Sequence, residues 1–156
     1  MIIIDEQNAK KYNDKKVIAL GNFDGIHLGH QELIKKSVEL SKKNRMMSSV
    51  FTFKQHTTKT ICKNNYQKLL TTNRKKIEEF SKFNLDYSII YDFNKEFSLL
   101  SPEDFIKSVL VDELNMKIAV VGDNYKFGYN ASGDVSLLES FSKIYGYEVN
   151  VIEPIK

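Results

Sequence analysis

Hydrophobic residues occur along the chain in short continuous runs, separated by longer stretches with helical spacing. The runs are apolar throughout rather than alternating, which is typical of strands that are covered on both faces. We interpret five of them as strands: "VIAL" (Val17–Leu20), "SVFTF" (Ser49–Phe53), "YSII" (Tyr87–Ile90), "IAVV" (Ile118–Val121) and "VNVI" (Val149–Ile152).

Four further stretches have the spacing of amphipathic helices. They cover residues 30–43, 71–83 ("TTNRKKIEEFSKF"), 101–114 ("SPEDFIKSVLVDEL") and 135–146 ("VSLLESFSKIYG"). The third is the clearest, because Ser101 can cap its first turn and Pro102 stands at the first helical position. Gly146 is expected to end the last helix. Strand and helix alternate along the whole length, which predicts one α/β domain with a parallel sheet and helices on both faces.

Composition is ordinary for a globular domain of 156 residues, with 42% hydrophobic residues and a net charge of +3. Many lysines form doublets, such as Lys35–Lys36, Lys42–Lys43 and Lys75–Lys76, which we expect on the solvent faces of helices. None of the basic runs reaches the five to eight residues that indicate a nucleic-acid patch. We therefore expect no nucleic-acid partner.

The amino-terminal stretch and the single cysteine bear on the cellular compartment. The apolar patch in "MIIIDEQNAKK" is too short for a signal peptide, and none of the hydrophobic runs could span a membrane. Cys62 has no second cysteine with which to form a disulfide. We expect a cytoplasmic protein without a membrane partner.

The stretch "GNFDGIHLGH" joins the first predicted strand to the first predicted helix. Gly21 and Gly25 allow a sharp turn, and Gly29 leaves room for a phosphate against the backbone. The helix start adds unpaired N–H groups and the positive end of its dipole. His27 and His30 add two hydrogen-bond donors that are cationic when protonated. This combination predicts a site for a phosphate chain.

Other interpretations of this stretch remain open. Zinc needs three or four ligands, and only His56 and Cys62 could join the histidine pair, so no metal site built from side chains is expected. The histidines could also lie in an ordinary surface turn. A second glycine-rich segment, "GYNASGD", has the glycine spacing of a P-loop, but Asp134 stands where that motif requires lysine.

Four motifs carry a resemblance to a known family. "GNFDGIHLGH" resembles the H-x-G-H signature of the nucleotidyltransferase superfamily, in the form found in FMN adenylyltransferase domains of bacterial bifunctional riboflavin kinase/FAD synthetases. "VFTFKQH", "LSPEDFIKSVL" and "VVGDNYKFGYNASGD" are similar to that family's T-F-x-P-H, L-S-x-x-x-F and V-V-G-x-x-F-x-F-G-x-x-x-x-G segments. The resemblance covers residues 17–154 and implies a Rossmann-like nucleotidyltransferase fold.

The resemblance also implies an activity and a site. AMP would pass from MgATP to FMN, giving FAD and pyrophosphate, with Mg²⁺ bridging phosphate oxygens. The catalytic residues would be His27, His30 and Asn124. The nucleotide would contact Gly21, Asn22, Phe23, Asp24, Gly25, Gly29 and Gly122, and the flavin would contact Phe53, His56, Tyr125 and Phe127. The four flavin-side residues have simpler interpretations as core or surface positions.

The chain also departs from the family pattern. Gln55 replaces the proline of T-F-x-P-H, and Tyr125 stands where phenylalanine is common. The sequence stops at "VIEPIK", before the family's S-S-T-x-I-R motif, and carries no riboflavin kinase domain. We therefore expect residues 1–156 to be the adenylyltransferase domain alone, with a riboflavin kinase domain in the parent chain. Three alternatives remain: a non-catalytic nucleotide- or flavin-binding module, a shortened domain with weak activity, and a cytidylyl- or adenylyltransferase for another phosphate.

Overall fold

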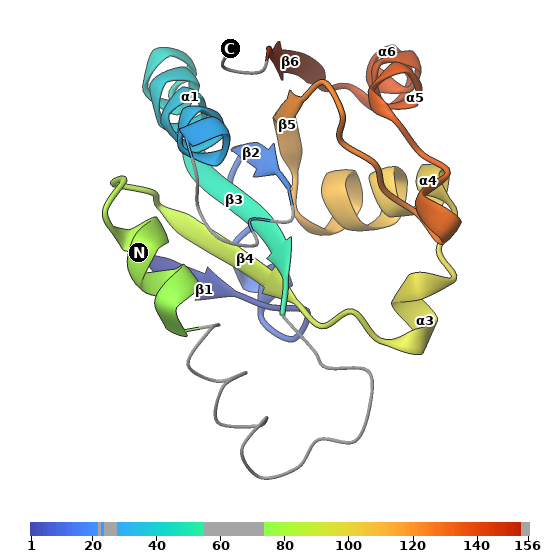
Figure 1. Cartoon of the computed structure of the whole chain (residues 1–156), viewed down its shortest axis with the longest axis horizontal. Helices are drawn as coiled ribbons and strands as arrows, with labels where there is room; N and C mark the ends of the chain where they lie inside the picture. Colours follow the sequence, from blue (N-terminus) through green and yellow to red (C-terminus); the bar gives the residue numbers. More distant parts are fainter. Residues whose placement is uncertain (22, 24–27, 55–73, 154–156) are drawn as a thin grey trace, which may run out of the picture.

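The computed structural model describes residues 1–21, 23, 28–54 and 74–153. Within these residues, parallel strands form one sheet in the order β1-β4-β3-β2-β5-β6 (Figure 1). The strands are β1(Ile2–Ile4), β2(Lys16–Leu20), β3(Met47–Phe53), β4(Tyr87–Tyr91), β5(Met116–Gly122) and β6(Glu148–Ile152). The five predicted strands are thus confirmed, within one or two residues at their ends.

The path of the chain through the sheet reverses once in the middle. From β2 the chain proceeds outward to β3 and β4, and then returns to place β5 on the other side of β2. β2 therefore pairs with β3 on one side and with β5 on the other. In open parallel sheets, ligands bind at such a reversal, outside the carboxyl ends of the strands.

Helices cover both faces of the sheet, as predicted (Figure 1). One face carries α1(Leu28–Asn44) and a helix over residues 74–81. The other carries α4(Pro102–Asp104), η2(Phe105–Glu113), α5(Val135–Ser140) and α6(Ser142–Tyr145), and short helical turns form η1(Ala9–Lys11), α3(Lys95–Ser98) and η3(Tyr129–Ala131). Among the described residues, none of the helices is long and apolar enough to cross a membrane.

The strands supply side chains alternately to two hydrophobic clusters, one on each face. On β2, Val17 and Ala19 pack toward α1, whereas Ile18 and Leu20 pack toward η2. All four side chains are buried. The continuously apolar strand sequences are explained by this two-sided burial.

Two predicted helix boundaries are confirmed by their capping interactions. The Ser101 hydroxyl accepts a hydrogen bond of 3.1 Å from the Asp104 N–H, and Pro102 follows it at the first helical position. Gly146 ends α6 with φ +77°, a left-handed conformation that glycine adopts without strain. Local sequence signals therefore set these ends.

Three details differ from the sequence prediction. β1 was not predicted, because three apolar residues show no period, and the strand is stabilised by pairing with β4 far along the chain.

The predicted helix over 135–146 is broken at Phe141 into α5 and α6. The hydroxyls of Ser140 and Ser142 donate to backbone carbonyls one turn earlier, at 2.7 Å each, which bends helices. Finally, η2 is a wider π-type helix, in which the Leu114 N–H donates to the Val109 carbonyl.

A buried lysine fixes the amino-terminal edge of the sheet. The Lys16 ammonium donates to the carbonyls of Leu114 at 2.9 Å, Asp14 at 3.1 Å and Tyr12. Burial lowers its pKa to about 8, an effect that the nearby Asp14 carboxylate opposes. Lys16 thus joins the start of β2 to the end of η2, at the edge opposite the strand carboxyl ends.

Candidate active site

Two glycines lie side by side where the sheet reverses. Gly21 directly follows β2, and Gly122 is the last residue of β5. The two strands are paired, with Ala19 opposite Val120, so each glycine follows two residues later at the same edge. Both positions present backbone without a side chain, at the place where a parallel sheet binds its ligand.

His30 lies in the first turn of α1, the helix that follows β2 and Gly21 in the chain. The ring of the half-buried His30 packs against the Phe23 ring, with 5.1 Å between centroids. The N-terminus of this 17-residue helix places the positive end of its dipole beside His30. A cationic or hydrogen-bonding histidine here favours negative charge on a ligand.

Phe23 is completely buried, with none of its surface exposed. A Cβ added at Gly21 would lie 3.1 Å from the Phe23 ring, so the absence of a side chain at Gly21 lets the ring fit beneath it. The Phe23 ring therefore packs against two predicted site residues, Gly21 and His30, and its own role at a nucleotide stays a prediction.

Asn124 follows β5 in a turn that the Tyr125 N–H closes onto the Gly122 carbonyl at 3.3 Å. Its side chain is exposed, and its Oδ1 would lie 3.5 Å from a Cβ added at Gly122. The amide thus projects beside Gly122, next to the glycine that follows β2. This places a hydrogen-bonding side chain on the β5 side of the edge.

Phe53, at the end of β3, belongs to an aromatic group at the same edge of the sheet. Its half-buried ring makes edge-to-face contacts with Phe93 at 5.0 Å and Phe97 at 5.1 Å between centroids. Phe93 is half exposed, so part of this group is accessible from solvent. Neither Phe93 nor Phe97 was predicted for the site, although a phenylalanine pair four residues apart just after a strand is a recognisable signal.

Tyr125 and Phe127 form a stacked pair, with 5.6 Å between centroids and 18° between planes. Phe127 is buried and Tyr125 is half-buried, so Tyr125 presents the accessible surface of the pair. The backbones of Phe127 and Gly133 exchange hydrogen bonds of 3.1 and 2.7 Å. A Cβ at Gly133 would lie only 2.7 Å from the Phe127 ring, and Asp134 caps α5 by accepting from the Leu137 N–H at 2.9 Å. The "GYNASGD" segment therefore serves packing and capping in this structure.

The remaining predicted site residues fall into two groups. Gly29 lies in α1. Outside the described residues lie Asn22, Asp24, Gly25, His27 and His56. Their roles remain predictions.

The family model named FAD synthetase matches residues 9–156. The chain belongs to the FAD synthetase family. It is 37% identical to a bifunctional riboflavin kinase/FMN adenylyltransferase from Buchnera aphidicola subsp. Schizaphis graminum, over 94% of this chain and 46% of the relative. The Escherichia coli K12 protein of the same description is 30% identical, over 85% of the chain and 42% of the relative. The chain thus spans about half the length of these relatives.

A solved structure shows the same fold. It is described as a macrolide-efflux protein from Streptococcus pneumoniae, and it matches with a TM-score of 0.73 over 100% of this chain and 51% of that chain. At 23% identity, this similarity concerns the fold alone. Together with the sheet order, it confirms the predicted Rossmann-like architecture.

Lys76 is buried, although it was expected on a solvent face. The Lys75–Lys76 doublet was expected on a solvent face, but Lys76 is only 5% exposed. Its ammonium lies 3.5 Å from the Thr52 hydroxyl on β3, one residue before Phe53. The prediction was wrong because Lys76 lies one helical turn before the buried Phe80, on the inward face of the helix.

A separate cavity of about 300 Å³ lies at the amino ends of β5 and β6, away from the residues of the candidate site. Its lining includes Asn44, Lys117 and Glu148. The reversal point and the glycine pair lie at the opposite edge of the sheet, so we do not assign this cavity to the site.

Tyr125 offers a test of its packing through pH. Burial raises the pKa of its hydroxyl above the usual range. The unfolded chain then loses this proton near pH 10 while the folded chain keeps it, so the free energy of unfolding should fall as pH rises above 10. We expect Tyr125→Phe to reduce the difference in unfolding free energy between pH 9 and pH 11, measured by urea denaturation. An unchanged difference would contradict the burial of the hydroxyl.

Proposed function

We propose that this chain transfers AMP from MgATP to FMN, giving FAD and pyrophosphate, and that residues 1–156 form the adenylyltransferase domain. One observation carries the proposal: a member of the FAD synthetase family has His30, Asn124 and two glycines at the reversal point of its sheet. The relatives named above carry both activities in their names, and this supports a riboflavin kinase domain as the partner. We also propose a cytoplasmic location, as befits synthesis of an intracellular cofactor.

The proposed reaction needs no covalent protein intermediate. An FMN phosphate oxygen attacks the α-phosphorus of ATP, the bond between the α-phosphorus and the bridging oxygen breaks, and pyrophosphate leaves with that oxygen. His30 and the N–H groups at the start of α1 stabilise the negative charge that builds on the phosphates. Asn124 holds a phosphate or nucleotide oxygen from the β5 side. Positioning and charge stabilisation together account for catalysis.

Mg²⁺ enters this scheme as part of the substrate MgATP. In the part of the chain that the structure describes, no group of three histidine, cysteine or acidic side chains could hold a metal ion. Phosphate oxygens of the nucleotide, together with water, are usual ligands of Mg²⁺ in such sites.

The flavin is proposed to bind along the aromatic side of the edge. Phe53 and Tyr125 offer partly exposed rings there, and Phe127 supports Tyr125 from within the core. Such rings can stack on a planar isoalloxazine. His56 is proposed for the same side on the basis of the motif resemblance.

The test is to mix the chain with FMN and MgATP and to follow FAD and pyrophosphate by chromatography. We expect equal amounts of the two products, with little product when CTP replaces ATP. Saturable binding of ATP or FMN without product would instead favour the non-catalytic binding module. Product only from CTP or from another phosphate acceptor would favour the related transferases.

A further inference from the structure

Three aromatic rings lie in a row between the helix over residues 74–81 and the start of α1. Phe80 meets Phe23 edge to face, with 5.5 Å between centroids and 89° between planes. Phe23 in turn meets His30 at 5.1 Å and 54°. Contacts of this geometry are favourable for aromatic rings and restrict their orientation. The row links the helix over residues 74–81 to a proposed catalytic side chain.

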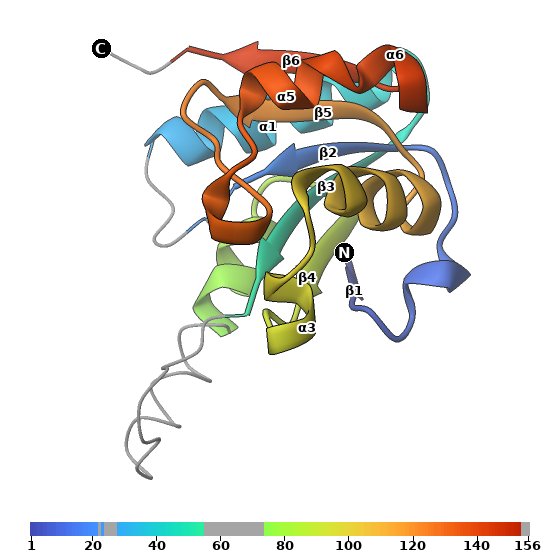
Figure 2. The same ribbon diagram turned by 90° about the vertical axis from the view of Figure 1, so that its right-hand side faces the viewer.

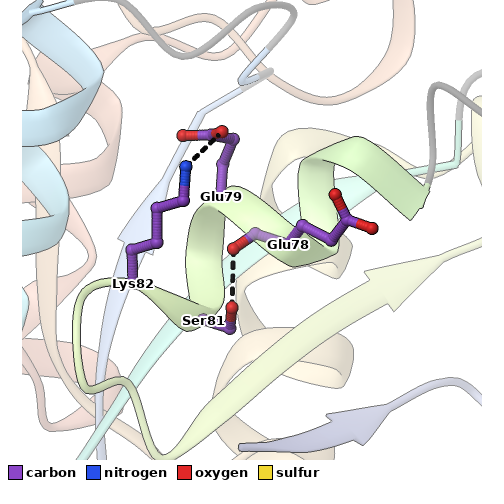
Figure 3. Close-up of polar contacts among 4 residues, drawn as sticks. All are labelled: Glu78, Glu79, Ser81 and Lys82. Carbon is purple, nitrogen blue, oxygen red and sulfur yellow. Dashed lines mark hydrogen bonds and ion pairs between the residues drawn. The ribbon is translucent and has the colours of Figure 1, made fainter.

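Phe80, at the outer end of the row, is held in place because the helix over residues 74–81 has one exposed face and one buried face. On its exposed side, Lys82 pairs with Glu79 at 2.9 Å, and the Ser81 hydroxyl donates to the Glu78 carbonyl at 2.6 Å (Figure 3). Phe80 lies on the inward side and is completely buried. The helix cannot rotate without exposing this ring, so the Phe80 edge is a fixed support.

Phe23, the middle ring of the row, has a strained backbone conformation that side-chain packing maintains. Phe23 has φ +53°, in the left-handed region that costs a residue with a Cβ about 1–2 kcal/mol. Such a conformation persists only where packing determines it. Here the ring is completely buried between Gly21, Phe80 and His30. Ring packing therefore fixes the position of Phe23, and with it the surface on which His30 rests.

We infer that Phe80 is a positioning residue, which acts through Phe23 to orient His30 for charge stabilisation at the transferred phosphate. The inference rests on the proposed adenylyl transfer, because that reaction makes the orientation of His30 matter. Small displacements of a charge-stabilising group slow a reaction much more than they weaken ground-state binding. Phe80 should therefore affect kcat more than KM.

The test compares Phe80→Leu with a matched control, Phe83→Leu. Phe83 lies three residues later and packs half-buried at the border of the same hydrophobic cluster. We expect Phe80→Leu to lower kcat for FAD formation about tenfold while KM for MgATP changes less than about twofold. Phe83→Leu should keep kcat within about twofold of the parent, whatever melting temperature it loses. Equal kcat values for the two variants would overturn the inference.

Coupling to His30 supplies a second kinetic criterion. If Phe80 acts through His30, then adding Phe80→Leu to His30→Ala should slow the reaction no further. Independent, multiplicative losses in the double variant would show that Phe80 acts by another route, and would overturn the inference.

A spectroscopic readout separates this inference from the proposed function. The chain has three histidines, so His30 ring signals in a proton–carbon NMR spectrum can be assigned from the signals that His30→Ala removes. Phe80→Leu should shift the His30 signals, and Phe83→Leu should leave them in place. Unmoved His30 signals in Phe80→Leu would overturn the inference. A parent chain that makes no FAD would instead overturn the proposed function, while the shift comparison still tests the ring contacts.

Discussion

His30→Ala is expected to slow FAD formation by roughly 10²–10³-fold, the usual loss when one charge-stabilising donor is removed from a phosphoryl or acyl transfer site. The side chain stands at the start of α1, where helix N–H groups and dipole already favour negative charge. Initial rates with saturating FMN and MgATP would measure the effect. His27→Ala should show a similar loss, by resemblance to the family motif.

Two further variants make the result for His30 specific. His30→Gln keeps a hydrogen-bond donor but not the cationic charge, so it should retain more activity than His30→Ala. Lys35→Ala changes an exposed residue of the same helix, whose ammonium lies 3.9 Å from the Glu32 carboxylate. It should stay within about twofold of the parent, because exposed ion pairs contribute little. Rates for His30→Ala close to those of Lys35→Ala would remove His30 from the proposed mechanism.

Gly128→Ala is expected to cause a large loss of stability. Gly128 has φ +79°, and a Cβ there would lie 2.7 Å from the Pro102 side chain and 2.8 Å from its backbone nitrogen. The left-handed conformation and the overlap should together lower the free energy of unfolding by about 2–4 kcal/mol. A thermal melt should show a midpoint about 5–15 °C below the parent.

Gly146→Ala is the matched control for this loss. Gly146 has nearly the same φ, +77°, but none of the described residues beyond its chain neighbours has an atom within 4 Å of the position where a Cβ would be added. It should lose only the conformational part, about 1–2 kcal/mol. Equal losses in the two variants would show that overlap with Pro102 adds nothing to the cost of a side chain at Gly128.

The sheet and most of its helices could be predicted because their signals are local. Continuous apolar runs indicated strands buried on both sides, and Ser101 and Gly146 marked helix ends that the structure confirms. β1 could not be predicted in this way, because its three residues are stabilised by pairing with β4, which lies far later in the sequence. Non-local pairing leaves no period in the sequence.

The sequence predicted candidate site residues, but not the buried side chains that pack behind them. The motifs placed Gly21 and Asn124 after strands and His30 near the start of the following helix, and the structure brings β2 and β5, which precede Gly21 and Asn124, together in the sheet. The burial of Phe23 could not be foreseen, because the burial of a loop side chain depends on tertiary contacts. Phe80 could have been noticed from its spacing to other inward residues of its helix, but its contact with Phe23 joins segments more than fifty residues apart in the sequence.

All strands of the described sheet are parallel, so their carboxyl ends lie at one edge and their amino ends at the other (Figure 2). The residues proposed to contact substrates lie at or after the carboxyl ends of β2, β3 and β5. Lys16 links the start of β2 to Leu114 at the opposite edge. Substitutions at exposed positions of the segments after the strands, as at Asn124, can then change substrate preference while leaving the buried framework intact. A lineage could therefore acquire a new nucleotide or acceptor by exchanging residues at one edge alone, and a library for directed evolution is best confined there.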